Sequence, residues 1–117
     1  MNRKKNPYNT AKKVPSYIVK RTDVDFKWDS SEEHTVGCYH NIKTAETAKV
    51  TDMLSCIEVD DFKLTEELKE KTIAVFCGNS EPEEKFIVNG FVVVQDELYL
   101  DDPETVAPAY SWEIEKA

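Results

Sequence analysis

The dipeptide Asn89-Gly90 constrains the fold of this chain more than any other short feature. It stands between two apolar runs, residues 86–88 and residues 91–94. Asn and Gly tolerate the positive φ angles that a two-residue hairpin turn requires, so this pattern is the strongest local signal for a β-hairpin. The sequence therefore predicts two antiparallel strands joined at residues 89–90.

Further strands are predicted from alternating or short apolar runs. In residues 22–29, the apolar Val24, Phe26 and Trp28 alternate with charged residues, which is typical of a half-buried antiparallel strand. After a polar turn at residues 29–34, residues 35–42 form the next predicted strand. Other segments also have β character: β-branched and aromatic residues begin after Pro15, and residues 72–78 are a short apolar run expected to be β. Residues 98–102 continue the second hairpin strand or, with a break favoured at 95–97, begin a new one. Residues 110–116 are a closing strand, in which Tyr110, Trp112 and Ile114 share a face.

Two helices are predicted between these β segments. Residues 44–58 place Val50, Met53, Leu54 and Ile57 at helical spacing, with Thr44 as the expected N-cap. Residues 64–71 are the shorter helix, with Thr65 as its cap. The predicted fold class is α+β, a single small domain with a mostly antiparallel sheet of about six short strands and two short helices.

Charge divides the chain into two parts. Residues 1–21 hold seven of the 15 basic residues and no acidic residue, whereas residues 22–117 hold eight basic and all 23 acidic residues, a net charge of −15. We therefore expect a basic flexible arm over residues 1–21 and an acidic α+β domain over residues 22–117. A domain of that charge should repel nucleic acid and anionic lipid and should attract basic surfaces.

Composition also limits where in the cell the protein is expected. The longest apolar run, residues 73–77, is far shorter than the roughly 20 residues that a bilayer helix needs. The basic arm lacks the apolar centre of a secretory signal, and Pro7 and Pro15 disfavour the amphipathic helix of a mitochondrial transit peptide. Three irregularly spaced cysteines favour free thiols in a reducing compartment. The expected location is the cytoplasm, or a host cytoplasm or virion if the protein is viral, with no membrane contact.

Catalytic motifs are absent from the sequence. His34, Cys38 and His40 are suitable zinc ligands, but no C-x-x-C pair accompanies them, and a buried cysteine beside a partly exposed histidine explains the pattern as well. Neither a phosphate-binding loop nor a nucleophile elbow is present. The sequence therefore predicts no enzyme, no cofactor and no metal.

The favoured function is a non-enzymatic protein-interaction module. Its acidic body would dock on a basic surface of a protein partner and inhibit or regulate it, a style of action frequent among phage and viral inhibitors. The acidic residues predicted to bind that partner are Asp60, Asp61, Glu83, Glu84, Asp101 and Asp102.

Two alternatives remain open at this point. In the first, the chain is a structural or assembly protein whose basic arm binds neighbouring subunits or a scaffold. In the second, the arm binds nucleic acid, for which the acidic body offers no support. Both alternatives depend on the basic residues of the arm, namely Arg3, Lys4, Lys5, Lys12 and Lys13.

Overall fold

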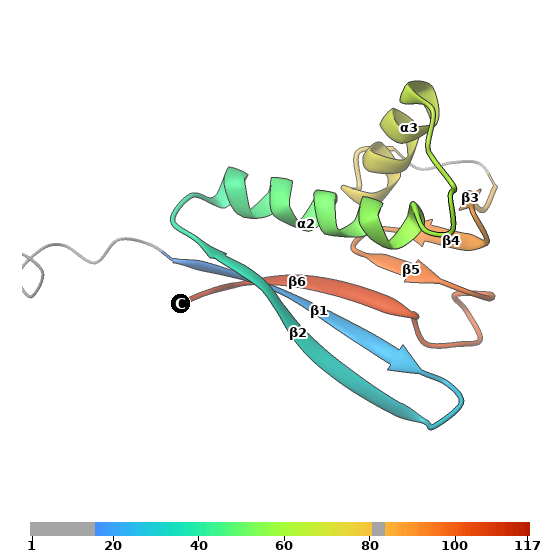
Figure 1. Cartoon of the computed structure of the whole chain (residues 1–117), viewed down its shortest axis with the longest axis horizontal. Coiled ribbons are helices and arrows are strands. Elements are labelled where there is room, and N and C mark those ends of the chain that lie inside the picture. The colour runs from blue at the N-terminus through green and yellow to red at the C-terminus, as the bar shows by residue number, and fades with distance from the viewer. Residues whose placement is uncertain (1–15, 81–83) are drawn as a thin grey trace, which may run out of the picture.

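The computed structural model describes residues 16–80 and 84–117, which form one antiparallel sheet and two helices (Figure 1). The elements in chain order are β1 (Tyr17–Asp25), β2 (Ser30–Tyr39), α2 (Ile42–Ile57), α3 (Glu66–Phe76), β3 (Ile87–Val88), β4 (Phe91–Val94), β5 (Glu97–Tyr99) and β6 (Tyr110–Lys116). The sheet order is β2-β1-β6-β5-β4-β3, and every neighbouring pair is antiparallel. This arrangement confirms the predicted α+β fold with six strands and two helices.

The first and the last strand meet in the middle of the sheet. β1 pairs with β2 on one side and with β6 on the other, from Tyr17 opposite Lys116 to Asp23 opposite Tyr110. β6 also pairs with β5, so it joins the long β1–β2 hairpin to the short strands β3, β4 and β5. The two halves of the sheet therefore depend on the C-terminal strand for their connection.

Both helices lie on the same face of the sheet, and the far end of the β1–β2 hairpin extends beyond them (Figure 1). α2 packs on β2, β1 and β6, whereas α3 packs on β4. Between the helices and the sheet, the rings of Phe76 and Trp112 meet edge to face with centroids 5.3 Å apart. The buried core consists of Met53, Ile57, Leu64, Val75, Phe76, Val88, Phe91, Val93, Leu98 and Trp112.

β1 begins at Tyr17, inside the range that the sequence assigns to the basic arm. Val19 is fully buried, and the two cations beside it are matched by carboxylates. Lys20 Nζ lies 2.8 Å from Glu115 Oε1, and Arg21 contacts Asp23 and Asp52. Residues 17–21 belong to the sheet, where these pairs offset the charge of Lys20 and Arg21. Residues 1–15 lie outside the described part of the chain.

The turn of the β1–β2 hairpin lies at residues 26–29, earlier than predicted. The expected polar turn at residues 29–34 lies almost wholly within β2, which begins at Ser30. Asp25 ends β1, and its Oδ1 accepts hydrogen bonds from the backbone N–H groups of Lys27 (3.0 Å) and Trp28 (3.4 Å). This local turn leaves Phe26 and Trp28 exposed, so the prediction that they face the core was wrong.

The helices also differ from the prediction at their ends. Asn41, rather than Thr44, caps α2, and its side chain accepts from the backbone N–H groups of the first turn. α2 therefore begins at Ile42, in a segment predicted as strand. Thr65 caps α3 as predicted, but this helix continues to Phe76 because Thr72, Val75 and Phe76 share its buried face. The predicted strand at 72–78 was wrong.

The turns of the β3–β4–β5 meander agree with the sequence. Asn89 and Gly90 both have positive φ, 46° and 82°, as a two-residue hairpin turn requires. The predicted break before residue 98 contains Asp96, whose φ is 61°. In the part of the chain that the structure describes, no helix is both long enough and apolar enough to cross a membrane.

Candidate functional site

The acidic residues predicted to bind a partner fall into two groups. Asp60 and Asp61 form the turn after α2, where both have positive φ and exposed side chains. Asp101 and Asp102 follow β5, and Lys85 Nζ lies 2.9 Å from Asp102 Oδ1, which brings the segment next to Glu84 close to them. Glu83 lies outside the described residues, as do the basic residues predicted to bind through the arm, namely Arg3, Lys4, Lys5, Lys12 and Lys13.

Asp102 is already used inside the protein. It accepts a hydrogen bond from the backbone N–H of Glu104 at 3.0 Å, and this bond together with Lys85 lowers its pKa. Asp101 is exposed, and its carboxylate accepts only a local bond, from the backbone N–H of Asp102, among the described contacts. Asp101 is therefore the better placed of the two for binding another molecule.

The histidines and cysteines do not form a metal site in the described residues. β1–β2 pairing puts His34 opposite Arg21 and Cys38 opposite Ile18, so these two side chains lie on opposite faces of the sheet. His34 Nε2 instead contacts Asp23 (3.3 Å) and Glu32 (3.5 Å). No group of three or more His, Cys, Asp or Glu side chains in residues 16–80 and 84–117 is arranged to hold a metal ion.

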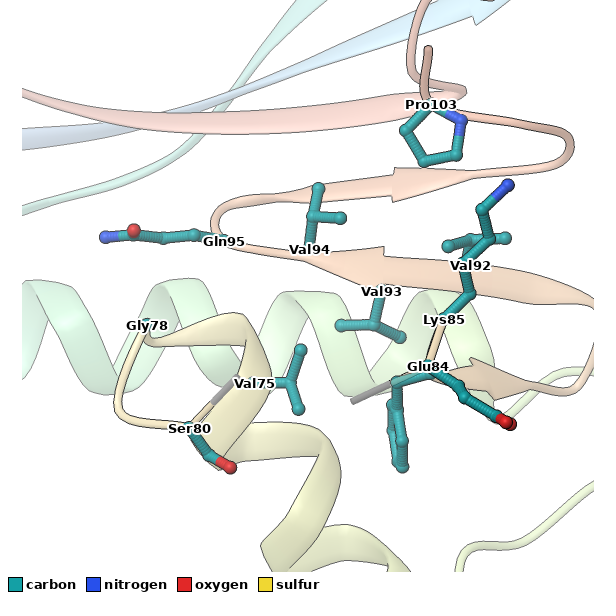
Figure 2. Close-up of a pocket in the computed structure, with 11 residues that line it drawn as sticks. Val75, Gly78, Ser80, Glu84, Lys85, Val92, Val93, Val94, Gln95 and Pro103 are labelled. Atoms are coloured by element: carbon teal, nitrogen blue, oxygen red, sulfur yellow. The ribbon is translucent and has the colours of Figure 1, made fainter. Parts of the chain in front are cut away.

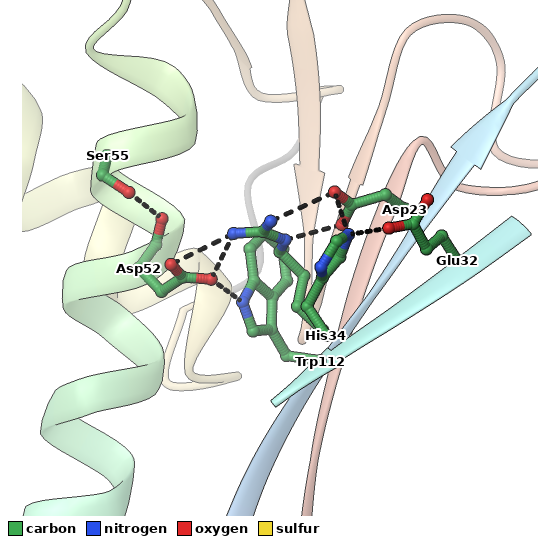
Figure 3. Close-up of polar contacts among 7 residues, drawn as sticks. Asp23, Glu32, His34, Asp52, Ser55 and Trp112 are labelled. Carbon is green, nitrogen blue, oxygen red and sulfur yellow. Dashed lines mark hydrogen bonds and ion pairs between the residues drawn. The ribbon is translucent and has the colours of Figure 1, made fainter. Parts of the chain in front are cut away.

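A polar cluster, formed by Arg21, Asp23, His34, Asp52 and Trp112, joins α2 to the sheet (Figure 3). Arg21 Nη1 donates to both carboxylate oxygens of Asp52, at 3.1 and 3.0 Å, and its Nε donates to Asp23 at 2.6 Å. Trp112 Nε1 donates to the same Asp52 carboxylate at 2.9 Å. The cluster therefore ties β1, β6 and α2 together.

The electrostatics of this cluster favour a structural role. The hydrogen bond to Asp23, followed by the contacts with Asp52, raises the pKa of Arg21, so the guanidinium stays charged. Both partners are only partly exposed, which makes the pair stronger than a surface pair. Sequence reasoning missed this cluster, although Asp52 interrupts the apolar face of the predicted helix beside Met53. The only sign of the cluster in the sequence is the carboxylate of Asp52 next to predicted core positions, and the sequence does not indicate its partner.

The partly buried thiols are poor nucleophiles. Burial raises the pKa of Cys56 to about 11, against a smaller lowering effect of Arg21, and burial also raises the pKa of Cys77. Because the thiolate is the reactive form, both side chains are unreactive near neutral pH.

A cavity of about 460 Å³ lies between the end of α3, β4 and the segment around Lys85 (Figure 2). Figure 2 shows Val75 of α3 and Val92, Val93 and Val94 of β4 along its walls. Its polar lining side chains are Ser80, Glu84, Lys85 and Gln95, and the described contacts join none of these to another. These lining side chains suit contact with an apolar group of a ligand, and no described contact among them forms a catalytic acid–base pair.

Three of the exposed apolar side chains, Phe26, Trp28 and Leu100, lie at or near the turn of the β1–β2 hairpin. Phe26, Leu100 and Val106 line a shallow groove of about 240 Å³ together with Asp101. Phe26 is 49% exposed, Leu100 is 58% exposed, and Trp28, in the same turn as Phe26, is 71% exposed. We call Phe26, Trp28, Leu100 and Val106 the hairpin patch. Contiguous exposed apolar side chains are one feature that interaction surfaces share.

Carboxylates surround the hairpin patch. Asp25 and Asp29 are exposed at the two ends of the turn, and Asp101 lines the groove. Lys27 is a nearby cation, and its Nζ lies 5.6 Å from the centre of the Trp28 ring. The arrangement is an apolar centre with a negative rim, which suits a partner that carries basic side chains around an apolar cleft.

Comparison of this chain with models of protein families, with curated proteins and with solved structures finds no match to any of them.

Proposed function

We propose that this protein is a non-enzymatic protein-interaction module whose acidic body docks on a basic surface of a protein partner and thereby inhibits or regulates it. The observation that carries the proposal is the hairpin patch, with Trp28 71% exposed and Phe26 49% exposed beside Asp25 and Asp101. The patch supplies an apolar contact area for the partner, which exposed acidic residues alone would not offer.

The composition of the patch supports a binding role. Binding energy at protein interfaces is concentrated in a few aromatic and arginine side chains, which enter pockets on the partner. Tyr and Trp are enriched in such interfaces because they offer a large apolar area at low conformational cost. Trp28 and Phe26 are the exposed aromatic anchors that we assign to this task.

The charge of the rim supports the chemistry of the partner. Exposed carboxylates contribute little energy each, but a field of one sign guides a basic partner to the surface and rejects acidic ones. Asp25, Asp29 and Asp101 supply that field around the patch. Asp60 and Asp61, after α2, would extend the field without touching the patch partner.

The interior of the protein supports a non-enzymatic role. Several titratable groups are used in packing: Asp23 and Asp52 both bind Arg21, and burial raises the pKa of Cys56 and of Cys77. An active site needs a perturbed acid, base or nucleophile that faces a reachable cavity.

The test is a binding measurement with a purified partner. Tagged protein captures candidates from a lysate of the organism that encodes it, and each captured protein is then purified and titrated calorimetrically. We expect Trp28→Ala to weaken binding about tenfold or more. Asp25→Lys with Asp101→Lys should slow association and reduce its dependence on salt.

Ile87→Ala is the matched control, because Ile87 is also a highly exposed apolar side chain (61%) but belongs to β3. It should leave the affinity unchanged. The proposal is wrong if Trp28→Ala and the double charge reversal bind every captured partner as tightly as the original protein does.

A further inference from the structure

β2 is a long strand at the edge of the sheet. It runs for 10 residues, pairs with β1 on one side, and has no strand on its outer side among the described residues. A strand of this length presents a row of outward backbone N–H and C=O groups, which is a template for another strand. β2 contains neither lysine nor proline, the residues that most often block such an edge.

The edge of β2 is negatively charged on both faces of the sheet. Glu32 and Glu33 are consecutive, so their side chains lie on opposite faces, and both are largely exposed. Glu33 shares Lys20 with Glu115, so two carboxylates face one ammonium group there. A strand that adds to this edge should therefore carry a cation on each face, that is, two consecutive basic residues.

The chain itself contains that pattern. Lys12-Lys13 stands between Pro7 and Pro15, in a stretch of seven residues without proline or glycine, 8–14. If Lys12 lies opposite Glu33 in an antiparallel ladder, Lys13 lies opposite Glu32, and both faces are paired at once. The same register sets Thr10 opposite Thr35, a favourable cross-strand pair.

We propose that residues 10–14 of one copy add to β2 of a second copy as an antiparallel strand, with Lys12 opposite Glu33 and Lys13 opposite Glu32. The occupant of the edge is thus the basic segment of an identical chain. The assignment does not depend on the hairpin patch. Reciprocal exchange of the two segments would produce a closed dimer.

The length of the chain explains why the segment belongs to a second copy. Tyr17 pairs with Tyr39, seven residues along β2 from Glu32, which is roughly 23 Å in a strand. Tyr17 is four positions after Lys13, and four Cα-to-Cα steps span at most about 14 Å. Lys13 therefore cannot reach Glu32 of its own chain. An arm that folded back on its own β2 would also run parallel to that strand.

The test is a charge exchange between two variants of the full chain. One variant carries Lys12→Glu and Lys13→Glu, and the other carries Glu32→Lys and Glu33→Lys. In each variant alone the segment and the edge have the same sign, so we expect the dimer to weaken about tenfold or more. In an equimolar mixture each segment meets an edge of opposite sign, so a mixed dimer should form, and sedimentation velocity measures all three samples.

Glu66→Lys with Glu67→Lys is the matched control, because it changes the net charge equally on an exposed pair of α3. This control should stay dimeric, and circular dichroism checks that every variant is folded. The proposal is overturned by a monomeric original chain, by a Lys12→Glu, Lys13→Glu variant that dimerises normally, as direct pairing of two β2 edges would allow, or by a mixture that stays monomeric, as docking of each arm on its own body would cause.

Discussion

Two parts of the β1–β2 hairpin differ in which side chains they cover. One is the part under α2, which we call the covered end, and the other is the turn, which we call the exposed end. In the middle of β1, Arg21 and Asp23 form a partly buried network of ion pairs with Asp52 of α2. At the turn, beyond the helices, Phe26 and Trp28 face solvent beside Asp25 and Asp29. Within one pair of strands, charged side chains are partly buried under α2, whereas aromatic side chains are exposed to solvent at the turn.

The cover that α2 provides explains the difference. Under the helix, a charged side chain loses water and must find a partner, which Arg21 does at 3.0 Å from Asp52. Phe26 and Trp28 lie in the turn at residues 26–29, where the described residues leave them exposed. The exposure of the two aromatic side chains follows from their position in the turn.

Of the two parts of the hairpin, the covered end under α2 should show the larger effect on stability. Asp52→Ala removes two hydrogen-bond acceptors of Arg21 and the acceptor of Trp112 Nε1 together. Because the guanidinium and the indole N–H then lack their partner, we expect the free energy of unfolding to fall by about 2–3 kcal/mol. Urea denaturation followed by tryptophan fluorescence measures this change.

Asp52→Asn is the informative control for that experiment. The amide keeps one acceptor oxygen for Trp112 or Arg21 and loses only the charge, so the loss should be smaller, about 1 kcal/mol. Equal stability of the original protein and Asp52→Ala would mean that the polar cluster does not hold α2 to the sheet.

Much of the fold could be predicted from the sequence because the signals are local. The turn at Asn89-Gly90, the cap at Thr65 and the alternation of Tyr110 with Trp112 each depend on a few neighbouring residues. The strand at 72–78 was predicted wrongly because a short apolar run fits a strand and a buried helix turn equally well.

The sites were harder to predict because they depend on which layer covers which residue. Val24 lies on the opposite face of β1 from Arg21 and Asp23, which are on the side of α2, and Phe26 and Trp28 lie in the turn, so their alternation does not mark a buried face. Asp52 and Trp112 are 60 residues apart in the chain, and neither signals the other. The predicted acidic residue Asp101 does lie in the groove of the hairpin patch, but the sequence offered no sign of the apolar side chains beside it.

The modification rates of two cysteines can show how well the covered end is shielded from solvent. Cys56 lies near Arg21, and burial raises its pKa to about 11, whereas Cys38 is exposed on β2. We expect iodoacetamide at pH 8 to modify Cys38 at least about tenfold faster than Cys56. Mass spectrometry of peptides from a time course gives both rates.

The same label tests the polar cluster. If Asp52→Ala loosens α2, the modification of Cys56 should become faster while that of Cys38 stays unchanged. Similar rates at the two cysteines of the original protein would show that the covered end is open to solvent, and the contrast between the two ends would fail.

The smallest effect on stability is expected at the exposed end. Trp28→Ala removes a side chain that is 71% exposed, so the free energy of unfolding should change by no more than about 0.5 kcal/mol. Phe76→Ala, which empties a fully buried position against Trp112, should cost about 3–5 kcal/mol in the same assay. A large loss in Trp28→Ala would mean that the indole supports the fold, and weakened partner binding in that variant would then reflect misfolding. With stability unchanged, any loss of affinity belongs to the contact that Trp28 makes with the partner.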